Sequence, residues 1–347
     1  MANKYKNAPK KGADKRGAKT GNDRRDARKS INRSVNRTVK EKKVKIKNEP
    51  VVTAENQPQI GTIQWFPGHM ARTRRKIQES LSLIDAVVEI VDARIPLASR
   101  NPEMDTLTRG KPRLVILNKA DLADDVATKR WLTYFRRQGM AALAVDCKTG
   151  RGCQQFHDSL RELLHDLVEK WESKGAYRAI RAMIVGIPNV GKSSFINRMN
   201  RGGKAKVEDR PGVTRMNQWF VIEGGTQLLD TPGVLWPKFE DQAVAMRLAF
   251  TGAIKDQVLD MEEMACELLG ILRRDYPSVL IERYKLTEPL NEDNWELLRD
   301  IGRKRGMLVS GGEIDTERAS IMLLDEYRGG KLGRITLEWP PEERGEG

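Results

Sequence analysis

The sequence predicts an α/β fold in which a domain of about six strands carries a phosphate-binding loop. Short apolar runs alternate with helical patterns over residues 59–238, which is typical of a sheet with helices on its faces. Over 239–347 the patterns are helical and separated by Gly and Pro, so a small α-helical domain is expected. Residues 1–58 contain hardly any large apolar side chain and form a third segment, a basic tail.

The positive charge of the chain is concentrated in this tail. The 347 residues carry a formal charge of +14. Residues 1–50 contain 18 Lys and Arg against 5 Asp and Glu, a net charge of +13, which leaves only +1 for the rest. Such a segment cannot bury enough apolar surface to fold alone, so we expect it to be disordered. A long basic arm on a near-neutral body favours RNA binding through phosphate contacts; a tail that only improves solubility is the alternative.

Composition also bears on location. No apolar run approaches the length of about 20 residues that spans a bilayer. The first residues lack the apolar segment of a secretion signal, and early Asp residues argue against a mitochondrial leader. We therefore expect a cytoplasmic protein without membrane contact. Cys147, Cys153 and Cys266 lack the spacing of a zinc site or a disulfide framework and are expected to be small buried apolar residues.

The ordered part is expected to begin near residue 60, with the cluster Trp-Phe-Pro-Gly-His-Met at 65–70. His69 opens an amphipathic helix that is expected to continue to about Ile84, and the residue pattern alone favours a structural or exposed histidine. A buried strand over 85–91 follows. The polar loop 92–102 comes after this strand, at a position where loops of open α/β sheets line the ligand crevice.

A second apolar strand, 113–117, leads into Asn118-Lys-Ala-Asp121. The Asp121 carboxylate can accept hydrogen bonds from both N1–H and the N2 amino group of guanine, which adenine does not offer in that arrangement. Asn118 and Lys119 would brace the base and the neighbouring loop. The motif is short, but together with a phosphate-binding loop it predicts guanine as the base.

A third strand, 141–145, follows a helix over 124–138. Asp146 and Cys147 come next, in a loop that is expected to offer a backbone N–H to guanine O6. One long helix is then expected over 153–171. Its two histidines have no acidic partners at a spacing that suggests a metal site.

The stretch Gly186-Ile-Pro-Asn-Val-Gly-Lys-Ser-Ser194 lies between an apolar strand and a helix, as a phosphate-binding loop requires. Gly186 and Gly191 allow the backbone to fold around a phosphate, while N–H groups and the helix N-terminus supply positive potential. Lys192 adds a mobile charge, and the Ser193 hydroxyl would bind Mg²⁺. The predicted binding residues of this stretch are Gly186, Asn189, Val190, Gly191, Lys192, Ser193 and Ser194.

A polar, Gly-rich segment after this loop ends in Thr214, the candidate residue that senses Mg²⁺ and the γ-phosphate. Two short strands, 219–222 and 227–229, are expected to form a hairpin. The second strand reaches Asp230-Thr-Pro-Gly233. Asp230 would hold Mg²⁺ through water, and the Gly233 N–H would meet the γ-phosphate.

The C-terminal region contains no cluster of residues with catalytic chemistry, so a binding or steering role is expected for it. A short strand over 334–338 is expected to end it. The expected helices span 240–254, 260–274, 278–285, 292–305 and 313–328.

The nucleotide motifs occur in the order base, phosphate, switch, because Asn118 precedes Gly186, Thr214 and Asp230. This is a circular permutation of the usual GTPase order, which a compact domain tolerates because its termini often lie close together. The chain that leaves the Asp230 motif enters the helical region directly. Nucleotide state is therefore predicted to be transmitted to that region as a reorientation.

On these motifs the chain resembles the circularly permuted ribosome biogenesis GTPase A family of bacteria and organelles. The resemblance covers about residues 60–340 and includes WFPGHM, DARIPLASRNP, NKAD, GIPNVGKSS, PGVT and DTPG in that order. It implies a GTPase that binds the maturing large (50S) ribosomal subunit, assists a late assembly step and is stimulated by that subunit. It also implies a Mg²⁺ ion and, through Asn189, a K⁺ ion near the phosphates, and it points to His69 as the group that positions the attacking water.

Some positions depart from the family pattern. Asp146 and Cys147 stand where the family usually has Ser-Ala, and the stretch 207–210 is more acidic than is usual before PGVT. The Gln that orients water in many GTPases is absent after Gly233, where Val, Leu and Trp follow. By position, the resemblance assigns Asn118, Lys119 and Asp121 to guanine, residues 186–194 to the phosphates and Mg²⁺, and Thr214, Asp230 and Gly233 to the switches.

We therefore expect a Mg²⁺-dependent, K⁺-activated GTPase that is a monomer and binds GTP, GDP and the large ribosomal subunit. A GTP-dependent RNA-binding scaffold with incidental hydrolysis is the main alternative. A tRNA-modification GTPase is less favoured, because the chain has neither a folate-like domain nor a terminal reactive Cys.

Overall fold

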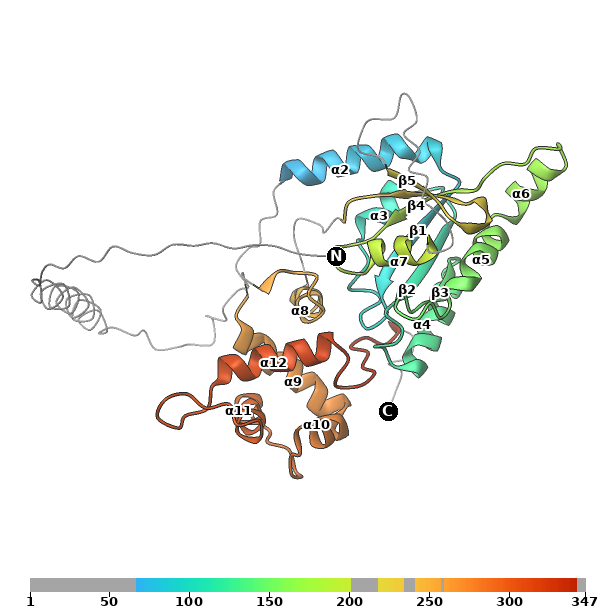
Figure 1. The fold of residues 1–347 in the computed structure, drawn as a ribbon. Coiled ribbons are helices and arrows are strands. Elements are labelled where there is room, and N and C mark those ends of the chain that lie inside the picture. Colours follow the sequence, from blue (N-terminus) through green and yellow to red (C-terminus); the bar gives the residue numbers. More distant parts are fainter. Residues whose placement is uncertain (1–66, 201–217, 234–240, 257–258, 342–347) are drawn as a thin grey trace, which may run out of the picture. The chain divides into compact units, whose positions relative to one another are not determined.

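The structure is a computed structural model and describes residues 67–200, 218–233, 241–256 and 259–341 (Figure 1). The basic tail and Thr214 lie outside the described residues, as does the side chain of His69. The expectations about them stay predictions.

In the described part of the chain, six strands form one sheet in the order β3-β2-β1-β4-β6-β5. All neighbouring pairs are parallel except β5 and β6, which form the expected antiparallel hairpin. The register pairs Asp92 with Asn118 and Ile184 with Asp230, so the carboxyl ends of the parallel strands meet at one edge of the sheet. The strands are β1 (Ala86–Asp92), β2 (Arg113–Asn118), β3 (Ala141–Ala144), β4 (Arg181–Val185), β5 (Gln218–Val221) and β6 (Gln227–Asp230).

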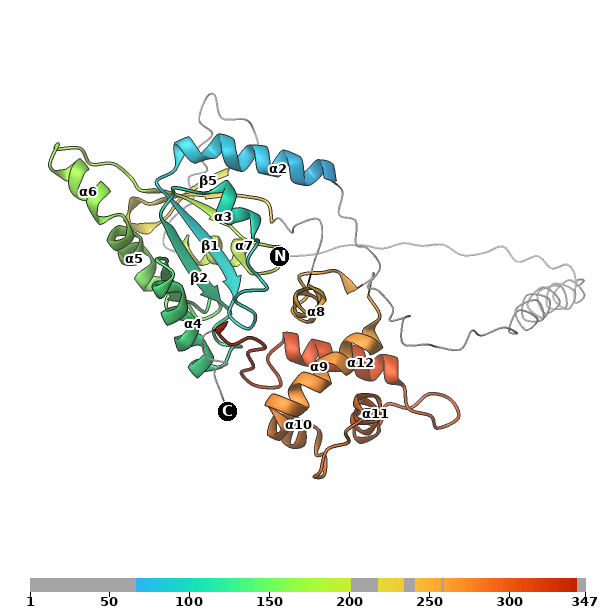
Figure 2. The same ribbon diagram turned by 180° about the vertical axis from the view of Figure 1, so that it is seen from behind.

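Helices cover both faces of this sheet, because alternate side chains of its buried strands point to opposite faces. Val87 and Val91 face the helices α2 (Pro67–Ser80), α3 (Glu103–Leu107) and α4 (Asp125–Arg137). Val88 and Ile90 face α5 (Phe156–Leu163) and α7 (Lys192–Met199) on the other side (Figure 2). The six-stranded, doubly covered α/β fold is confirmed.

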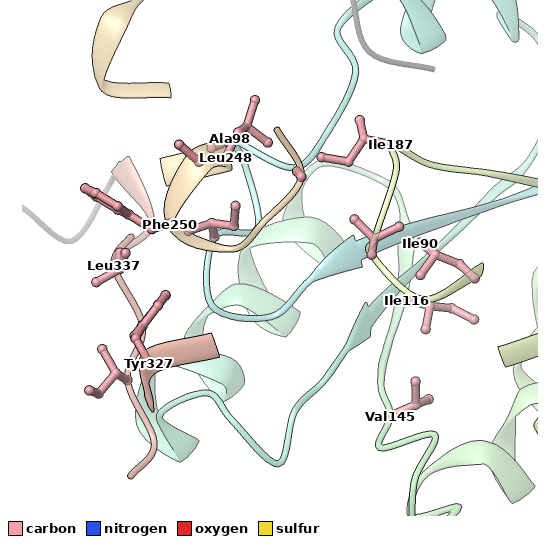
Figure 3. Packing of buried hydrophobic residues seen from close by; sticks show 14 of the residues in the cluster. Ile90, Ala98, Ile116, Val145, Ile187, Leu248, Phe250, Tyr327 and Leu337 are labelled. Carbon is pink, nitrogen blue, oxygen red and sulfur yellow. The ribbon is translucent and has the colours of Figure 1, made fainter. Parts of the chain in front are cut away.

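The C-terminal region is helical, as expected. Of its five described helices, four begin after an aspartate whose side chain accepts a hydrogen bond from a backbone N–H of the first turn, a favourable N-cap. The core is continuous with the sheet, because Leu248, Phe250 and Tyr327 belong to the same cluster as Ile90 (Figure 3). The helices are α8 (Gln242–Phe250), α9 (Met261–Asp275), α10 (Pro277–Tyr284), α11 (Asn294–Lys304) and α12 (Thr316–Arg328).

The strand expected over 334–338 is not formed. Two of its backbone N–H groups bond to loops instead of a neighbouring strand. Ile335 N donates to Leu122 O at 2.9 Å and Leu337 N donates to Arg94 O at 2.8 Å. The apolar alternation that suggested a strand instead buries Ile335 and Leu337 in the core.

The single helix expected over 153–171 is also wrong. The chain forms a short 3₁₀ helix, then α5, and after a break at Leu164 it forms α6 (His165–Glu172). Leu164 has φ −107° and ψ 21°, outside the helical range. Leu160, Leu164 and Val168, spaced by four residues, are buried against the core on both sides of the break.

Candidate nucleotide-binding site

The predicted motifs meet at the carboxyl edge of the sheet. The Asn118 motif follows β2, the Asp146 loop follows β3, the phosphate-binding loop follows β4 and the Asp230 motif ends β6. In open α/β sheets, this edge is where ligands bind.

The phosphate-binding loop has little room for side chains at its glycines. A Cβ atom on Gly186 would lie 2.6 Å from the carbonyl oxygen of Ile90. Gly191 has φ 97°, and a Cβ atom there would collide with the Asn118 side chain. The loop therefore follows the sheet closely and ends where α7 begins at Lys192. The N-terminal N–H groups of α7 provide the positive potential that a phosphate needs.

The Lys192 side chain is folded back onto this loop. Its ammonium donates to the carbonyl oxygens of Gly186 at 2.9 Å and Ile187 at 2.8 Å. Burial lowers the pKa of Lys192 to about 8, and the nearby Asp230 carboxylate opposes this shift. The DTPG motif closes over the ammonium, because a Cβ atom on Gly233 would lie 2.8 Å from Lys192 Nζ. A buried cation on neutral carbonyl groups is well suited to receive an anion.

Asp230 fits a role near a Mg²⁺ ion. Its Oδ1 atom is buried and has no hydrogen-bond partner among the described residues. Burial raises the pKa of Asp230, although Lys192 opposes the shift. Ser193, in the first turn of α7, is exposed. One carboxylate and one hydroxyl suit Mg²⁺, which usually keeps several waters and binds the substrate phosphates as well.

The Asn118 motif braces the phosphate-binding loop as expected. Asn118 Nδ2 donates to Val190 O and Lys119 Nζ donates to Asn189 O, each at 2.7 Å. Asn118 Oδ1 is buried and unpaired in the residues that the structure describes. The Asp121 side chain remains 25% exposed, with Lys148 Nζ 3.7 Å from its carboxylate. Asp121 is therefore open to a ligand, while its two neighbours are used to hold the loop.

The loop after β3 is fixed from two sides. The buried carboxylate of Asp146 accepts hydrogen bonds from Lys148 N at 2.8 Å and from the Thr149 hydroxyl. Burial alone would raise the pKa of Asp146, but these hydrogen bonds outweigh it and hold the pKa below its usual value. From α7, Arg198 Nε donates to Cys147 O at 2.7 Å. The helix that begins at the phosphate-binding loop thus also holds the loop that is expected to contact guanine.

Asn189 makes a contact that the sequence did not predict. Its Nδ2 atom donates to Gly252 O at 2.6 Å, just beyond the end of α8. The residue has φ 62°, a left-handed conformation that Asn tolerates. Because Nδ2 is engaged, Oδ1 is the side-chain atom left for the expected K⁺ ion.

Loop 92–102 is bonded to the C-terminal region through Arg94, Leu97 and Ala98, and its expected place along the ligand crevice stays a prediction. Asp92 pairs with Arg94 at 2.8 Å and with Lys119 at 3.0 Å. Burial would raise the pKa of Asp92, but the two cations outweigh it and hold the pKa well below its usual range. The Arg94 guanidinium lies over the Tyr327 ring, 5.1 Å from its centroid. The Glu338 carboxylate accepts from Leu97 N at 2.8 Å.

Sequence reasoning therefore missed Asp92 and Arg94 as the link between Lys119 and the C-terminal helices. The sequence signal for this link was a pair of opposite charges, Asp92 and Arg94, two positions apart within an apolar run. Such a pair is buried only if its charges are matched.

A sheet that is parallel except for its edge strand β5, with NKAD after β2, a phosphate-binding loop after β4 and DTPG at the end of β6, defines a circularly permuted P-loop GTPase domain. The protein named Ribosome biogenesis GTPase A of Bacillus cereus is 51% identical over 285 residues, which cover 82% of this chain and 96% of that protein. The chain therefore belongs to the ribosome biogenesis GTPase A family.

Other comparisons agree. The family model described as 50S ribosome-binding GTPase matches residues 181–286. Ribosome biogenesis GTPase A of Thermotoga maritima is 32% identical over 280 residues, 81% of this chain and 95% of the relative. The solved structure of GNP-bound YlqF from T. maritima has a TM-score of 0.53 at 28% identity and covers 78% of this chain and 99% of that chain. Among the described helices, none has the length and apolar character needed to cross a membrane.

Proposed function

We propose that this GTPase hydrolyses GTP with Mg²⁺ and uses the reaction in a late step of assembly of the large ribosomal subunit. The observation that carries the catalytic part is the direct bracing of the phosphate-binding loop by the guanine motif, through Asn118 to Val190 and Lys119 to Asn189. This bracing ties the position of Asp121 to that of the phosphates. A movement of the guanine motif is then expected to move the phosphate-binding loop as well.

In this proposal each described residue has a separate task. Asp121 accepts two hydrogen bonds from guanine, and a backbone N–H of the Asp146–Cys147 loop meets guanine O6. The N–H groups between Gly186 and Ser194 hold the phosphates together with Lys192, whose ammonium exchanges backbone carbonyls for phosphate oxygens. Ser193 and Asp230 hold Mg²⁺, which neutralises charge on the phosphates. Gly233 N–H meets the γ-phosphate.

The ribosomal part of the proposal rests on the relatives. Their names place them in ribosome biogenesis, and the matching family model is described as ribosome-binding. We propose that the large subunit is the partner, that it stimulates turnover, and that K⁺ contributes to the rate. The monomeric state and the cytoplasmic location stay predictions.

Single-turnover hydrolysis tests this proposal against a scaffold whose hydrolysis is incidental. Full-length protein in excess over GTP is assayed with and without purified large subunits, and binding to the subunits is measured in parallel with a non-hydrolysable analogue. We expect subunits to raise the rate at least about tenfold, a change of 1.4 kcal/mol in the barrier. Tight analogue-dependent binding with an unchanged rate would instead identify a scaffold.

The basic tail is proposed to add affinity for ribosomal RNA. Deleting residues 1–55, which hold nearly all of the net positive charge, should weaken RNA binding and flatten its salt dependence. Each lost phosphate contact on single-stranded RNA removes about 0.7 from the slope of log K against log salt. Nucleotide affinity of the same variant is the control and should be retained. An unchanged slope would mean that the tail serves solubility.

A further inference from the structure

Residues 146–153 form a tight loop whose two ends lie close together. Asp146 N donates to Arg151 O at 2.9 Å, Gly150 N donates to Asp146 O at 2.7 Å, and Cys153 N donates to Gly150 O at 3.1 Å. The turn brings Cys147 and Cys153 together, and the two thiols lie close enough to interact. Cys153 is buried in the core, whereas Cys147 packs against the core at its partly exposed rim.

This pair lies where a covalent change would reach the nucleotide. Cys147 follows Asp146 in the loop assigned to guanine O6, and its carbonyl oxygen is held at 2.7 Å by Arg198 from α7. The same helix begins at Lys192, in the phosphate-binding loop. A displacement of Cys147 would therefore change the contact of this loop with the base. It would also disturb the hydrogen bond by which Arg198 of α7 holds the loop.

We propose that Cys147 and Cys153 form a reversible disulfide and that this oxidation weakens guanine-nucleotide binding. The inference rests on the proposed function in one respect, the contact between this loop and guanine. It concerns a loop of this chain in which Asp146 and Cys147 stand where the resembling family usually has Ser-Ala.

The reaction balances with a peroxide as oxidant. One thiol gives up two electrons to hydrogen peroxide, becomes a sulfenic acid and releases one water. The sulfur of the other thiol attacks the sulfenic sulfur, the S–S bond forms, and the hydroxyl leaves with the second thiol proton as another water. A dithiol reductant reverses the step. Cys147, the partly exposed member of the pair, is the thiol that peroxide reaches.

The geometry determines which side of the loop moves. A disulfide requires an S–S distance of about 2.05 Å, shorter than any contact between two unbonded thiols. Gly152, next to Cys153, has φ 81°, and a Cβ atom there would collide with Ala144 O, so this side is tightly packed against β3. Cys147 is on the exposed side and must give way. Loss of the single N–H bond to guanine O6 corresponds to roughly a tenfold loss of affinity.

Affinity for a fluorescent GDP analogue, measured on the full-length protein before and after peroxide, tests the inference. Intact mass of the same samples shows whether two hydrogen atoms have been lost, and a dithiol reductant is then added. We expect a loss of two hydrogens and about tenfold weaker binding, both reversed by the reductant. Cys153→Ala should keep the affinity of the reduced protein and lose its sensitivity to peroxide. Cys266→Ala, which removes the third thiol, should respond as the wild type does.

Each result that contradicts the inference points to a different part of it. A disulfide that leaves GDP affinity unchanged overturns the inference and leaves the proposed function intact. Peroxide that produces no loss of two hydrogens in the folded protein overturns the proposed bond. If the reduced, folded protein binds no GDP, the site assignment fails and the inference fails with it. Thermal unfolding of each variant separates lost binding from lost folding.

Discussion

The side-chain amide of Asn189, in the phosphate-binding loop, donates a hydrogen bond of 2.6 Å to the carbonyl oxygen of Gly252, just after α8. Gly252 has φ 74°, the left-handed conformation that commonly ends a helix. Arg328 of α12 fixes this turn by donating to the carbonyl oxygens of Phe250 and Ala249 at 3.1 and 2.9 Å. The loop that is proposed to hold phosphates and K⁺ is therefore bonded directly to the C-terminal helices.

Substitution of Asn189 should separate its two roles. Asn189→Gly accommodates φ 62° without strain and removes both the donor to Gly252 and the oxygen proposed for K⁺. We expect K⁺-stimulated GTP turnover to fall about tenfold, while the rate in Na⁺ stays nearly unchanged. The measurement is the ratio of turnover rates in K⁺ and Na⁺.

Asn189→Asp is the matched control, since it keeps an oxygen for the cation but removes the amide donor. It should retain K⁺ stimulation and lose only the contact with Gly252. An Asn189→Gly variant with the wild-type ratio of rates would show that no K⁺ ion is held at this residue.

Nucleotide binding should take up a proton at mildly alkaline pH. In the free protein, burial lowers the pKa of Lys192 to about 8, against the opposing effect of Asp230. Bound phosphates stabilise the ammonium and raise this pKa. Above pH 8 the free lysine is largely neutral and must gain a proton on binding, so affinity should fall by up to about one log unit per pH unit.

Calorimetric titration of GDP in two buffers of different ionisation enthalpy measures this uptake. At about pH 6.5, Lys192 is charged in the free and the bound protein, so it should take up no proton on binding. An affinity independent of pH between about 8 and 9.5 would show that the phosphates do not reach the ammonium.

Asp121 should determine the choice of base. A carboxylate positioned for two guanine donors loses both partners with other bases, a cost of a few kcal/mol. Asp121→Asn should weaken GTP binding by about 10²-fold and shift preference toward xanthine nucleotides, which present an acceptor where guanine presents a donor. Competition titrations of GTP, XTP and ATP measure the preference. Equal affinity of the wild type for ATP and GTP would contradict the assignment.

His69 is predicted to position the attacking water, since no Gln follows Gly233. A neutral imidazole can accept a hydrogen bond from water near pH 7. His69→Ala should lower subunit-stimulated turnover by about 10²-fold, or about 3 kcal/mol in the barrier, with GTP affinity nearly intact. His69→Gln, which keeps an acceptor, is expected to recover part of the rate. Full stimulated turnover in the alanine variant would assign the water to a ribosomal group.

Local residue patterns were sufficient to predict most of the fold. The buried runs of β1, β2 and β4 and the aspartate caps of the C-terminal helices depend on neighbouring residues, so they could be predicted from the sequence. The glycines of the phosphate-binding loop could be recognised from the motif, but the contacts that leave no room for a Cβ at Gly186 and Gly191 come from Ile90 and Asn118 on other strands. The break at Leu164 was missed because residues 153–171 contain no Gly or Pro that would mark it.

By itself, the sequence determined the motifs, their permuted order and the guanine and phosphate chemistry that they imply. Only the tertiary structure decided which groups meet across long separations. Asn189 bonds to Gly252 across 63 residues, and Arg94 bonds to Tyr327 across 233 residues. Segment 334–338 does not join the sheet, because the loops after β1 and β2 offer carbonyl groups to its N–H groups. Such contacts depend on the order of strands in the sheet and on where the C-terminal helices pack, and no local residue pattern encodes either.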